Sequence, residues 1–201
     1  GKIVTLAKEV RRILGRKNCA FVLLRPLTYN RVYQKIGNLN RLLAWCHARA
    51  IETLAEQRPD CSRVVVDQFA KTEHTITRAL LPKGRKLKVE QMHKAERDIA
   101  VATASVLARD VFISEMKRMA ESYEVVFPKG AGPQVPTTLD SLLQSKGVEV
   151  LPAVAKCHFK TMDCLAKICL RVKRKEKRIE RSNMDSSSAC STYWELYSRG
   201  G

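Results

Sequence analysis

The spacing of apolar residues along the chain predicts two amphipathic helices in its first part. Within residues 3–14, apolar side chains recur every three or four positions with basic side chains between them. Gly15 follows at the position where helices commonly end. A longer helix is expected after Asn38, which suits the N-cap position, and it should end near Pro59.

The longest predicted helix covers residues 95–122. Its first half is apolar nearly all round and rich in alanine, which favours close packing against a sheet, and its second half is amphipathic. Shorter helical patterns occupy residues 75–81, 138–144 and 150–155.

Three apolar runs predict β-strands. Residues 19–24 form a continuous apolar run that stops before Pro26. Residues 63–69 carry a β-branched run without polar alternation, so this strand should be buried on both faces. A short strand is expected at residues 87–89. Because strands alternate with helices of crossover length, the predicted class is α/β, with parallel pairing of at least the first two strands.

The charge of the chain predicts a polyanionic partner. Lys and Arg number 37 against 20 Asp and Glu, which gives a formal net charge of +17. This imbalance exceeds what solubility requires and favours nucleic acid. An acidic lipid surface or ribosomal RNA would also match the charge.

Cysteine usage predicts a cytoplasmic protein with reduced thiols. The seven Cys residues are odd in number and irregularly spaced. Cys157 and His158 invite a zinc interpretation together with Cys164 and Cys169, but no pair has the Cys-x-x-Cys spacing, so no zinc is expected. The sequence contains no run long and apolar enough to span a membrane, and its first residues do not resemble a secretory leader.

Composition divides the chain into a body and a tail. The body is expected to end near residue 170. Residues 171–181 then hold seven Lys or Arg, and residues 182–201 are rich in serine and lack periodicity. We therefore expect a catalytic or binding domain at 1–170 and a poorly ordered tail at 171–201.

Two acids are candidates for chemistry. Asp67 ends the most apolar predicted strand, and in open α/β sheets that end faces the ligand crevice. Glu96 stands at the start of the long predicted helix. Plainer interpretations remain open: Asp67 as a loop acid that caps a helix, and Glu96 or Asp98 as a favourable negative charge near a helix N-terminus.

A third candidate is the loop Lys129-Gly130-Ala131-Gly132. Its glycines would let main-chain N–H groups approach a phosphate or a sugar closely. The loop lacks the spacing of a nucleotide P-loop, and an ordinary surface turn is the alternative.

Motifs in a fixed order resemble one family. They are VVDQFA at 65–70, KAE at 94–96, AVATASVLAR at 100–109, PKGAGP at 128–133 and AKCHF at 155–159. This order and spacing resemble ribonuclease HIII, of the type 2 ribonuclease H group, from about residue 1 to residue 166. The resemblance implies a ribonuclease-H-like mixed sheet flanked by helices.

The resemblance also implies a metal-dependent endoribonuclease. Members of the family bind Mg²⁺ or Mn²⁺ with four carboxylates and cleave the RNA strand of RNA/DNA hybrids, leaving a 3′-hydroxyl and a 5′-phosphate. Asp67 would match the third carboxylate and Glu96 the fourth. Lys94, Ser105, Arg109, Lys129, Gly130 and Gly132 would bind the hybrid, and a main-chain contact from the loop to a 2′-hydroxyl would distinguish RNA from DNA.

Part of the family pattern has no counterpart in the sequence. The first two carboxylates are an adjacent Asp-Glu pair, and no such dipeptide occurs here. The opening three-stranded meander and the N-terminal substrate-binding domain of the family are also without counterpart. Several carboxylates are needed to hold two divalent ions about 4 Å apart. We therefore expect that the chain descends from, or was cut from, a hydrolase, and that by itself it is inactive or depends on residues outside it. The protein is expected to be a monomer.

Two other functions remain open from the sequence. One is a basic nucleic-acid-binding remnant without catalysis, which would explain the lack of the carboxylate pair. The other is a structural ribosome-associated protein, for which the positive charge is the only support.

Overall fold

The computed structural model describes residues 1–72, 74–130 and 132–159. They form two compact units, one of residues 1–124 with 153–156 and one of residues 125–152 with 157–159. The predicted tail at 171–201, together with Cys164 and Cys169, lies outside the described residues.

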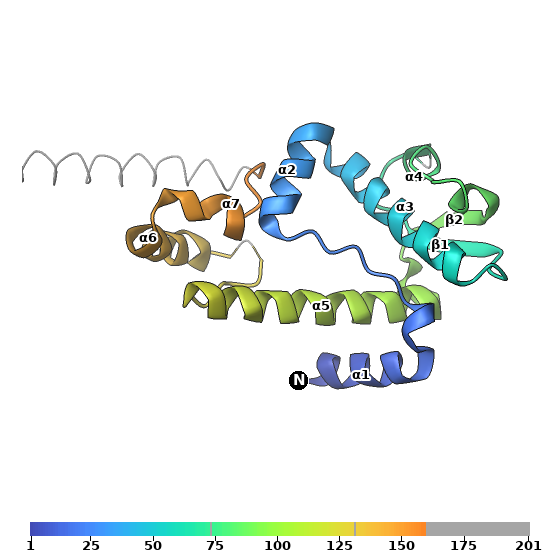
Figure 1. Cartoon of the computed structure of the whole chain (residues 1–201), viewed down its shortest axis with the longest axis horizontal. Coiled ribbons are helices and arrows are strands. Elements are labelled where there is room, and N and C mark those ends of the chain that lie inside the picture. Colours follow the sequence, from blue (N-terminus) through green and yellow to red (C-terminus); the bar gives the residue numbers. More distant parts are fainter. Residues whose placement is uncertain (73, 131, 160–201) are drawn as a thin grey trace, which may run out of the picture. The chain divides into compact units, whose positions relative to one another are not determined.

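The first unit begins with helices. Its elements in chain order are α1 (Lys2–Leu14), η1 (Arg16–Asn18), α2 (Pro26–Ile36), α3 (Leu39–Gln57), β1 (Arg63–Asp67), α4 (His74–Thr77), η2 (Gly84–Lys86), β2 (Lys88–Met92), η3 (Ala95–Arg97) and α5 (Ile99–Tyr123). The described part of the chain is thus mostly helical, with a small sheet (Figure 1).

The sheet consists of β1 and β2, paired in parallel from Arg63 opposite Lys88 to Asp67 opposite Met92. Parallel strands require a crossover connection, which residues 68–87 supply through α4 and η2. The predicted strands at 63–69 and 87–89 are therefore confirmed, each with shifted bounds.

The predicted strand at 19–24 is not part of this sheet. Residues 19–24 are assigned neither to a strand nor to a helix, and in Figure 1 they run between η1 and α2 as an extended connection. The expected pairing of the first two predicted strands is thus wrong. An apolar run favours an extended backbone, but a sheet also needs a neighbouring strand to exchange hydrogen bonds with.

Helix α3 packs against the sheet and supplies much of the core. Ala44 and Ile51 of α3 cluster with Val66 of β1 and with Ile76 and Leu80 of the crossover. Asn38 caps α3 as predicted, since its side chain accepts the N–H of Arg41 at 3.0 Å.

Helix α1 lies beside the long helix α5 (Figure 1). Ala7 is fully buried, and Arg11 reaches the buried Asp110 of α5. Ile3, Leu6 and Ile13 of the same amphipathic helix stay exposed. The apolar face of α1 is therefore only partly covered.

The second unit contains α6 (Gln134–Lys146) and η4 (Val148–Val150), and α7 (Leu151–Val154) begins in it. Leu139, Leu142 and Leu143 of α6 are buried. The helix predicted at 138–144 extends further than expected because Pro136 lies in its first turn, where the missing N–H costs nothing. No helix among the described residues is long and apolar enough to cross a membrane.

Candidate active site

Asp67 lies at the carboxyl end of β1 with its side chain exposed. Its Oδ1 accepts a hydrogen bond from the backbone N–H of Ala95 at 3.1 Å. Because Ala95 opens the short turn η3, the bond resembles a helix cap, as the plainer interpretation of Asp67 predicts. It also places the Asp67 carboxylate beside the residue that precedes Glu96.

The backbone turn before Ala95 creates this contact. Lys94 adopts the left-handed conformation, with φ 55° and ψ 46°, which is uncommon for a residue with a β-carbon. His93 and Lys94 form a turn directly after β2, and this turn directs the Ala95 N–H toward the end of β1. Backbone strain of this kind persists only where the surrounding structure holds it in place.

Glu96 lies in η3 and not in the first turn of the long helix. Asp98 is the N-cap of α5, with its Oδ1 accepting the N–H of Ala100 at 2.8 Å, so α5 starts at Ile99. The expected place of Glu96 in that helix is therefore wrong, because the better capping side chain comes two residues later. Among described residues, the exposed Glu96 carboxylate has neither an ion pair nor a side-chain hydrogen bond.

His47 is a neighbour of the site that sequence reasoning did not select. Its ring stacks on Phe69, with centroids 5.2 Å apart and planes 7° from parallel. Burial lowers the pKa of His47 below its usual value, and the negative charge of Asp67 partly opposes that shift. The sequence shows His47 only as a residue beside the apolar stripe of α3, so nothing local marks it.

The donor atoms at this site suit a hard divalent cation in kind but not in number. Carboxylate oxygens are the ligands that Mg²⁺ and Mn²⁺ prefer. Within the described ranges, however, no group of three or more His, Cys, Asp or Glu side chains gathers to hold a metal ion. Asp67 and Glu96 by themselves therefore do not form a complete site for a pair of ions.

Three of the residues predicted to bind substrate lie in the first unit. Lys94 belongs to the turn described above, and Ser105 and Arg109 are exposed on α5, four residues apart on one face. The guanidinium of Arg109 lies 5.3 Å from the centroid of the Phe112 ring. These side chains present one hydroxyl and two positive charges.

The predicted loop belongs to the second unit. Lys129 and Gly130 are exposed, and Gly130 has a φ of 108°, which only glycine adopts without strain. A β-carbon at Gly132 would lie 3.1 Å from Oε1 of Gln134. The backbone conformation at Gly130 thus favours glycine, and the approach of this loop to a phosphate or a sugar stays a prediction.

Comparison with known families shows to which family the chain belongs. Residues 2–162 match the Ribonuclease HII family, a range that contains Asp67, Glu96 and every other predicted site residue. The chain belongs to the ribonuclease HII family. The family relationship that the sequence motifs predict is therefore confirmed.

Relatives of the chain include ribonucleases HIII of Chlamydia species. The chain is 40% identical over 162 residues to ribonuclease HIII of Chlamydia pneumoniae, a match that covers 81% of this chain and 53% of the relative. The corresponding protein of Chlamydia caviae is 41% identical over 162 residues, with the same coverage. The chain thus spans about half the length of the curated relatives it matches.

Solved structures support the same fold. The crystal structure of Bst-RNase HIII in complex with Mn²⁺ is 25% identical and has a TM-score of 0.66, covering 75% of this chain and 50% of that protein. A mutant protein of Bst-RNase HIII is 26% identical, with a TM-score of 0.65 and coverage of 74% and 49%. The two-stranded parallel sheet and its helices are therefore part of a ribonuclease-H-like arrangement.

Proposed function

We propose that this chain belongs to a metal-dependent endoribonuclease that cleaves the RNA strand of RNA/DNA hybrids and leaves 3′-hydroxyl and 5′-phosphate ends. The observation that carries the proposal is the hydrogen bond from Ala95 to Asp67, because it brings the end of β1 to the residue next to Glu96. In this proposal Asp67 and Glu96 are the carboxylates that face the scissile phosphodiester.

Divalent ions in such an enzyme activate water and stabilise the leaving oxygen. Two carboxylates do not balance the charge of two divalent metal ions, so cleavage requires carboxylates beyond those gathered in the described residues. The proposed role of Asp67 and Glu96 is to supply oxygen ligands, with Mg²⁺ or Mn²⁺ as the cofactor.

The substrate is assigned from charge and from the family. A net charge of +17 favours a polyanion, and Lys94 and Arg109 are exposed cations in the same unit as Asp67. We assign them, together with Ser105 and the loop residues Lys129, Gly130 and Gly132, to contacts with the hybrid backbone.

A second function is a hybrid-binding protein without catalysis. The lack of a three-ligand cluster in the described part of the chain favours it. In this case binding depends on salt but not on a divalent ion.

The two functions are distinguished with a labelled RNA/DNA hybrid in the presence and absence of MnCl₂. The nuclease is tested in the chain joined to the preceding segment of a relative, which restores the carboxylates that the family pattern requires. Cleavage by this longer protein that is abolished in Asp67→Asn and Glu96→Gln supports the nuclease. Glu121→Gln is the matched control, since Glu121 is an exposed acid of α5 paired with Lys117, and this variant should behave as the unmodified chain. Binding without cleavage, unchanged by MnCl₂ and by Asp67→Asn, supports the second function.

A further competition experiment tests the substrate class. Unlabelled RNA duplex or ribosomal RNA should displace the labelled hybrid less effectively than unlabelled hybrid does. Equal displacement by ribosomal RNA would contradict both functions and favour a ribosome-associated protein.

A further inference from the structure

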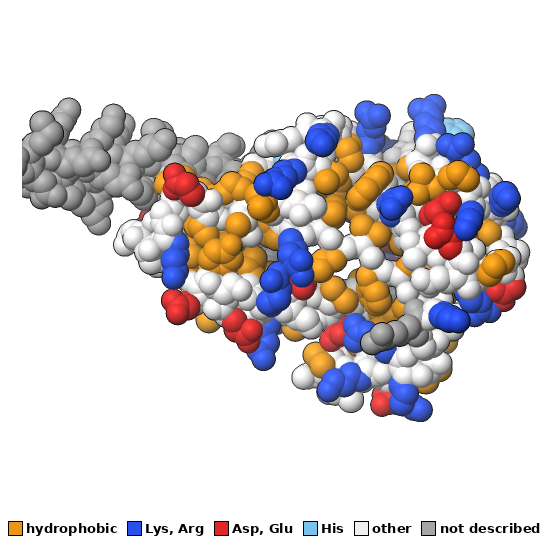
Figure 2. Space-filling model, viewed as in Figure 1, with side chains coloured by type: hydrophobic (Ala, Val, Ile, Leu, Met, Phe, Trp, Pro, Cys, Tyr) orange, Lys and Arg blue, Asp and Glu red, His pale blue; other side chains and the backbone are white. Residues whose placement is uncertain are grey.

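Positive charge is concentrated in the part of the chain that forms α2 and most of α3. Residues 10–51 hold nine Lys or Arg and no Asp or Glu, and this is the longest stretch of the sequence without an acid. In Figure 2, Lys and Arg side chains but no acidic ones lie over α2 and the first part of α3. These two helices therefore present a cationic surface.

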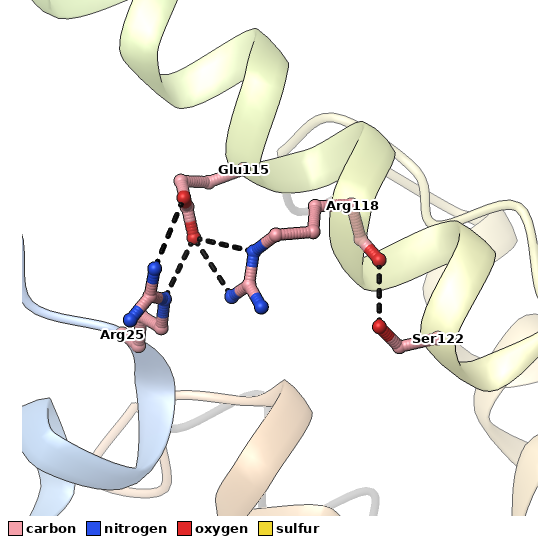
Figure 3. Close-up of polar contacts among 4 residues, drawn as sticks. All are labelled: Arg25, Glu115, Arg118 and Ser122. Carbon is pink, nitrogen blue, oxygen red and sulfur yellow. Dashed lines mark hydrogen bonds and ion pairs between the residues drawn. The ribbon is translucent and has the colours of Figure 1, made fainter.

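Some cations of this stretch are neutralised by acids from α5. Arg25 donates to both carboxylate oxygens of Glu115, at 2.9 and 3.4 Å, and Arg118 donates to the same carboxylate (Figure 3). Arg11 is bound to Asp110 in the same way. The exposed cations of α2 and α3, by contrast, form no ion pair with any described residue; they are Arg31, Lys35, Arg41 and Arg49.

Two of these cations flank an exposed tryptophan. Arg41, Trp45 and Arg49 follow one another at intervals of four residues, so they share one face of α3, called here the outer face. About 12 Å of helix axis separates the first from the last. Trp45 is 38% exposed, and among the described side chains neither an aromatic ring nor a cation stacks on its indole.

The outer face is separate from the side of α3 that faces the candidate site. His47 stacks on Phe69 near the end of β1, and it lies about 200° round the helix from Trp45. Leu43 and His47 line the apolar cavity between α3 and α5, whereas no residue of the outer face does. A ligand on the outer face would therefore not compete with a metal ion at Asp67.

The acid nearest to the outer face in sequence is already engaged. Glu52, one turn after Arg49 with respect to the helix, accepts the backbone N–H groups of Lys83 and Gly84 at 2.8 to 3.1 Å. At the other end, the first turn of α3 carries no acid, so the positive end of the helix dipole adds to the charge of Arg41. The outer face is thus suited to an anionic ligand.

The tryptophan narrows the chemistry of that ligand. Guanidinium groups bind phosphates, and an exposed indole between them offers a π-face on which a nucleobase stacks. The bases of a duplex are stacked on one another and are not free for such a contact, whereas unpaired bases are. The combination therefore favours a single strand over a duplex, and over an acidic peptide, which supplies charge without bases.

We propose that the outer face of α3 binds single-stranded nucleic acid, with one base stacked on Trp45 and neighbouring phosphates bound by Arg41 and Arg49. Arg31 and Lys35 of α2 add long-range attraction. DNA and RNA strands share the phosphates and the base faces, so both are ligands. This proposal does not depend on the proposed nuclease function.

The test measures binding of fluorescein-labelled strands of twelve nucleotides to the purified 201-residue chain by fluorescence anisotropy. Oligothymidylate and oligouridylate should both bind. An abasic strand of the same length, which keeps the phosphates but lacks the bases, should bind at least fivefold more weakly. Trp45→Ala should weaken binding of oligothymidylate at least fivefold and leave binding of the abasic strand unchanged, and Trp45→Phe should retain most of the affinity because its ring still stacks.

Tryptophan fluorescence reports the stacking directly and does not require Trp45 to be changed. The sequence contains two tryptophans, Trp45 and Trp194. In the variant Trp194→Phe, oligothymidylate should quench the fluorescence that remains, and the abasic strand should not. This measurement stays informative even where Trp45→Ala impairs folding.

The contribution of the arginines is measured from the dependence of binding on salt. Arg41→Gln and Arg49→Gln should each reduce the slope of log affinity against log salt by about 0.7 for oligothymidylate. Arg12→Gln is the matched control, because Arg12 is an exposed cation of α1 that pairs with Glu9 and lies outside the outer face. Its slope should equal that of the unmodified chain.

Five results would overturn the proposal. They are absence of oligothymidylate binding, equal affinity for the abasic strand, lack of quenching, equal changes of slope in Arg12→Gln and Arg41→Gln, and binding of polyglutamate as strong as that of oligothymidylate. The last result would assign the outer face to an acidic polypeptide. A blunt RNA/DNA hybrid should bind to Trp45→Ala as well as to the unmodified chain, and a fivefold loss there would assign Trp45 to the hybrid site instead.

Discussion

Arg11 of α1 donates a hydrogen bond of 2.6 Å to the carboxylate of Asp110 in α5. The Asp110 side chain is only 8% exposed, whereas that of Arg11 is 38% exposed. The pair joins two helices far apart in sequence, and it neutralises an acid that the helix packing removes from water.

Arg11→Ala should destabilise the chain by about 1–3 kcal/mol, because it leaves the buried Asp110 carboxylate without its donor. Urea unfolding followed by circular dichroism measures the change. Arg12→Ala is the matched control: Arg12 is exposed and pairs with Glu9 of the same helix, so the loss should stay below about 0.5 kcal/mol. Equal losses in the two variants would show that Asp110 does not need Arg11.

Ile76 anchors the crossover between the two strands. It is fully buried in α4, a helix of four residues, and belongs to the cluster beneath α3. Ile76→Ala should cost about 2–5 kcal/mol through lost burial and a cavity. Thr77→Ala, at the exposed next position, should change the free energy of unfolding by no more than about 0.5 kcal/mol. A small effect at Ile76 would mean that the cluster repacks.

Glu52 of α3 couples stability to pH. Its carboxylate accepts the backbone N–H groups of Lys83 and Gly84 at 2.8 to 3.1 Å. Burial alone would raise the pKa of Glu52, but these hydrogen bonds bring it below the ordinary value of 4.5. A carboxyl with a lowered folded-state pKa contributes stability above that ordinary value, and the contribution is lost as pH falls through the folded pKa.

Glu52→Gln should therefore lower the melting temperature at pH 7. The difference in melting temperature between this variant and the unmodified chain should become smaller as the pH falls from about 5 to 3. Thermal melts at each pH test this. Glu56→Gln, which removes only an exposed ion pair to Lys83, should follow the unmodified chain at every pH. A constant difference between Glu52→Gln and the unmodified chain would show that ionisation of Glu52 contributes nothing.

Arg109 should contribute one phosphate contact if the chain binds hybrids as proposed. Arg109→Ala should weaken binding and reduce the slope of log affinity against log salt by about 1. Filter binding between 50 and 200 mM salt measures the slope. Lys117→Ala, farther along α5 and paired with Glu121, should leave the slope unchanged. A Lys117→Ala effect as large as that of Arg109→Ala would indicate non-specific attraction to the whole helix.

Helices were the part of the fold most accessible from the sequence. Their apolar spacing and caps are local signals, so Asn38 and the long run ending near residue 122 predicted α3 and most of α5. The prediction of a paired strand at 19–24 was wrong. Its apolar run does give an extended backbone, but pairing depends on a neighbour that no local pattern specifies.

The candidate site was accessible only in part. The β-branched run correctly places Asp67 at the end of a strand. The hydrogen bond from the Ala95 N–H to Asp67 depends on the left-handed conformation of Lys94, and a lysine in the sequence does not indicate that conformation. His47 was missed because its stacking on Phe69 joins two distant elements, which only the folded chain brings together.

The parallel register of β1 and β2 determines where the molecule tolerates inserted residues. Asp67 stands opposite Met92, and Glu96 follows a few residues later, so the spacing of the two acids is set by the strand ladder and the turn after it. Extra residues in the exposed part of the crossover near Lys71 would lengthen a surface connection and leave both acids in place. A single residue inserted within β2 would exchange its two faces and displace Glu96 from Asp67.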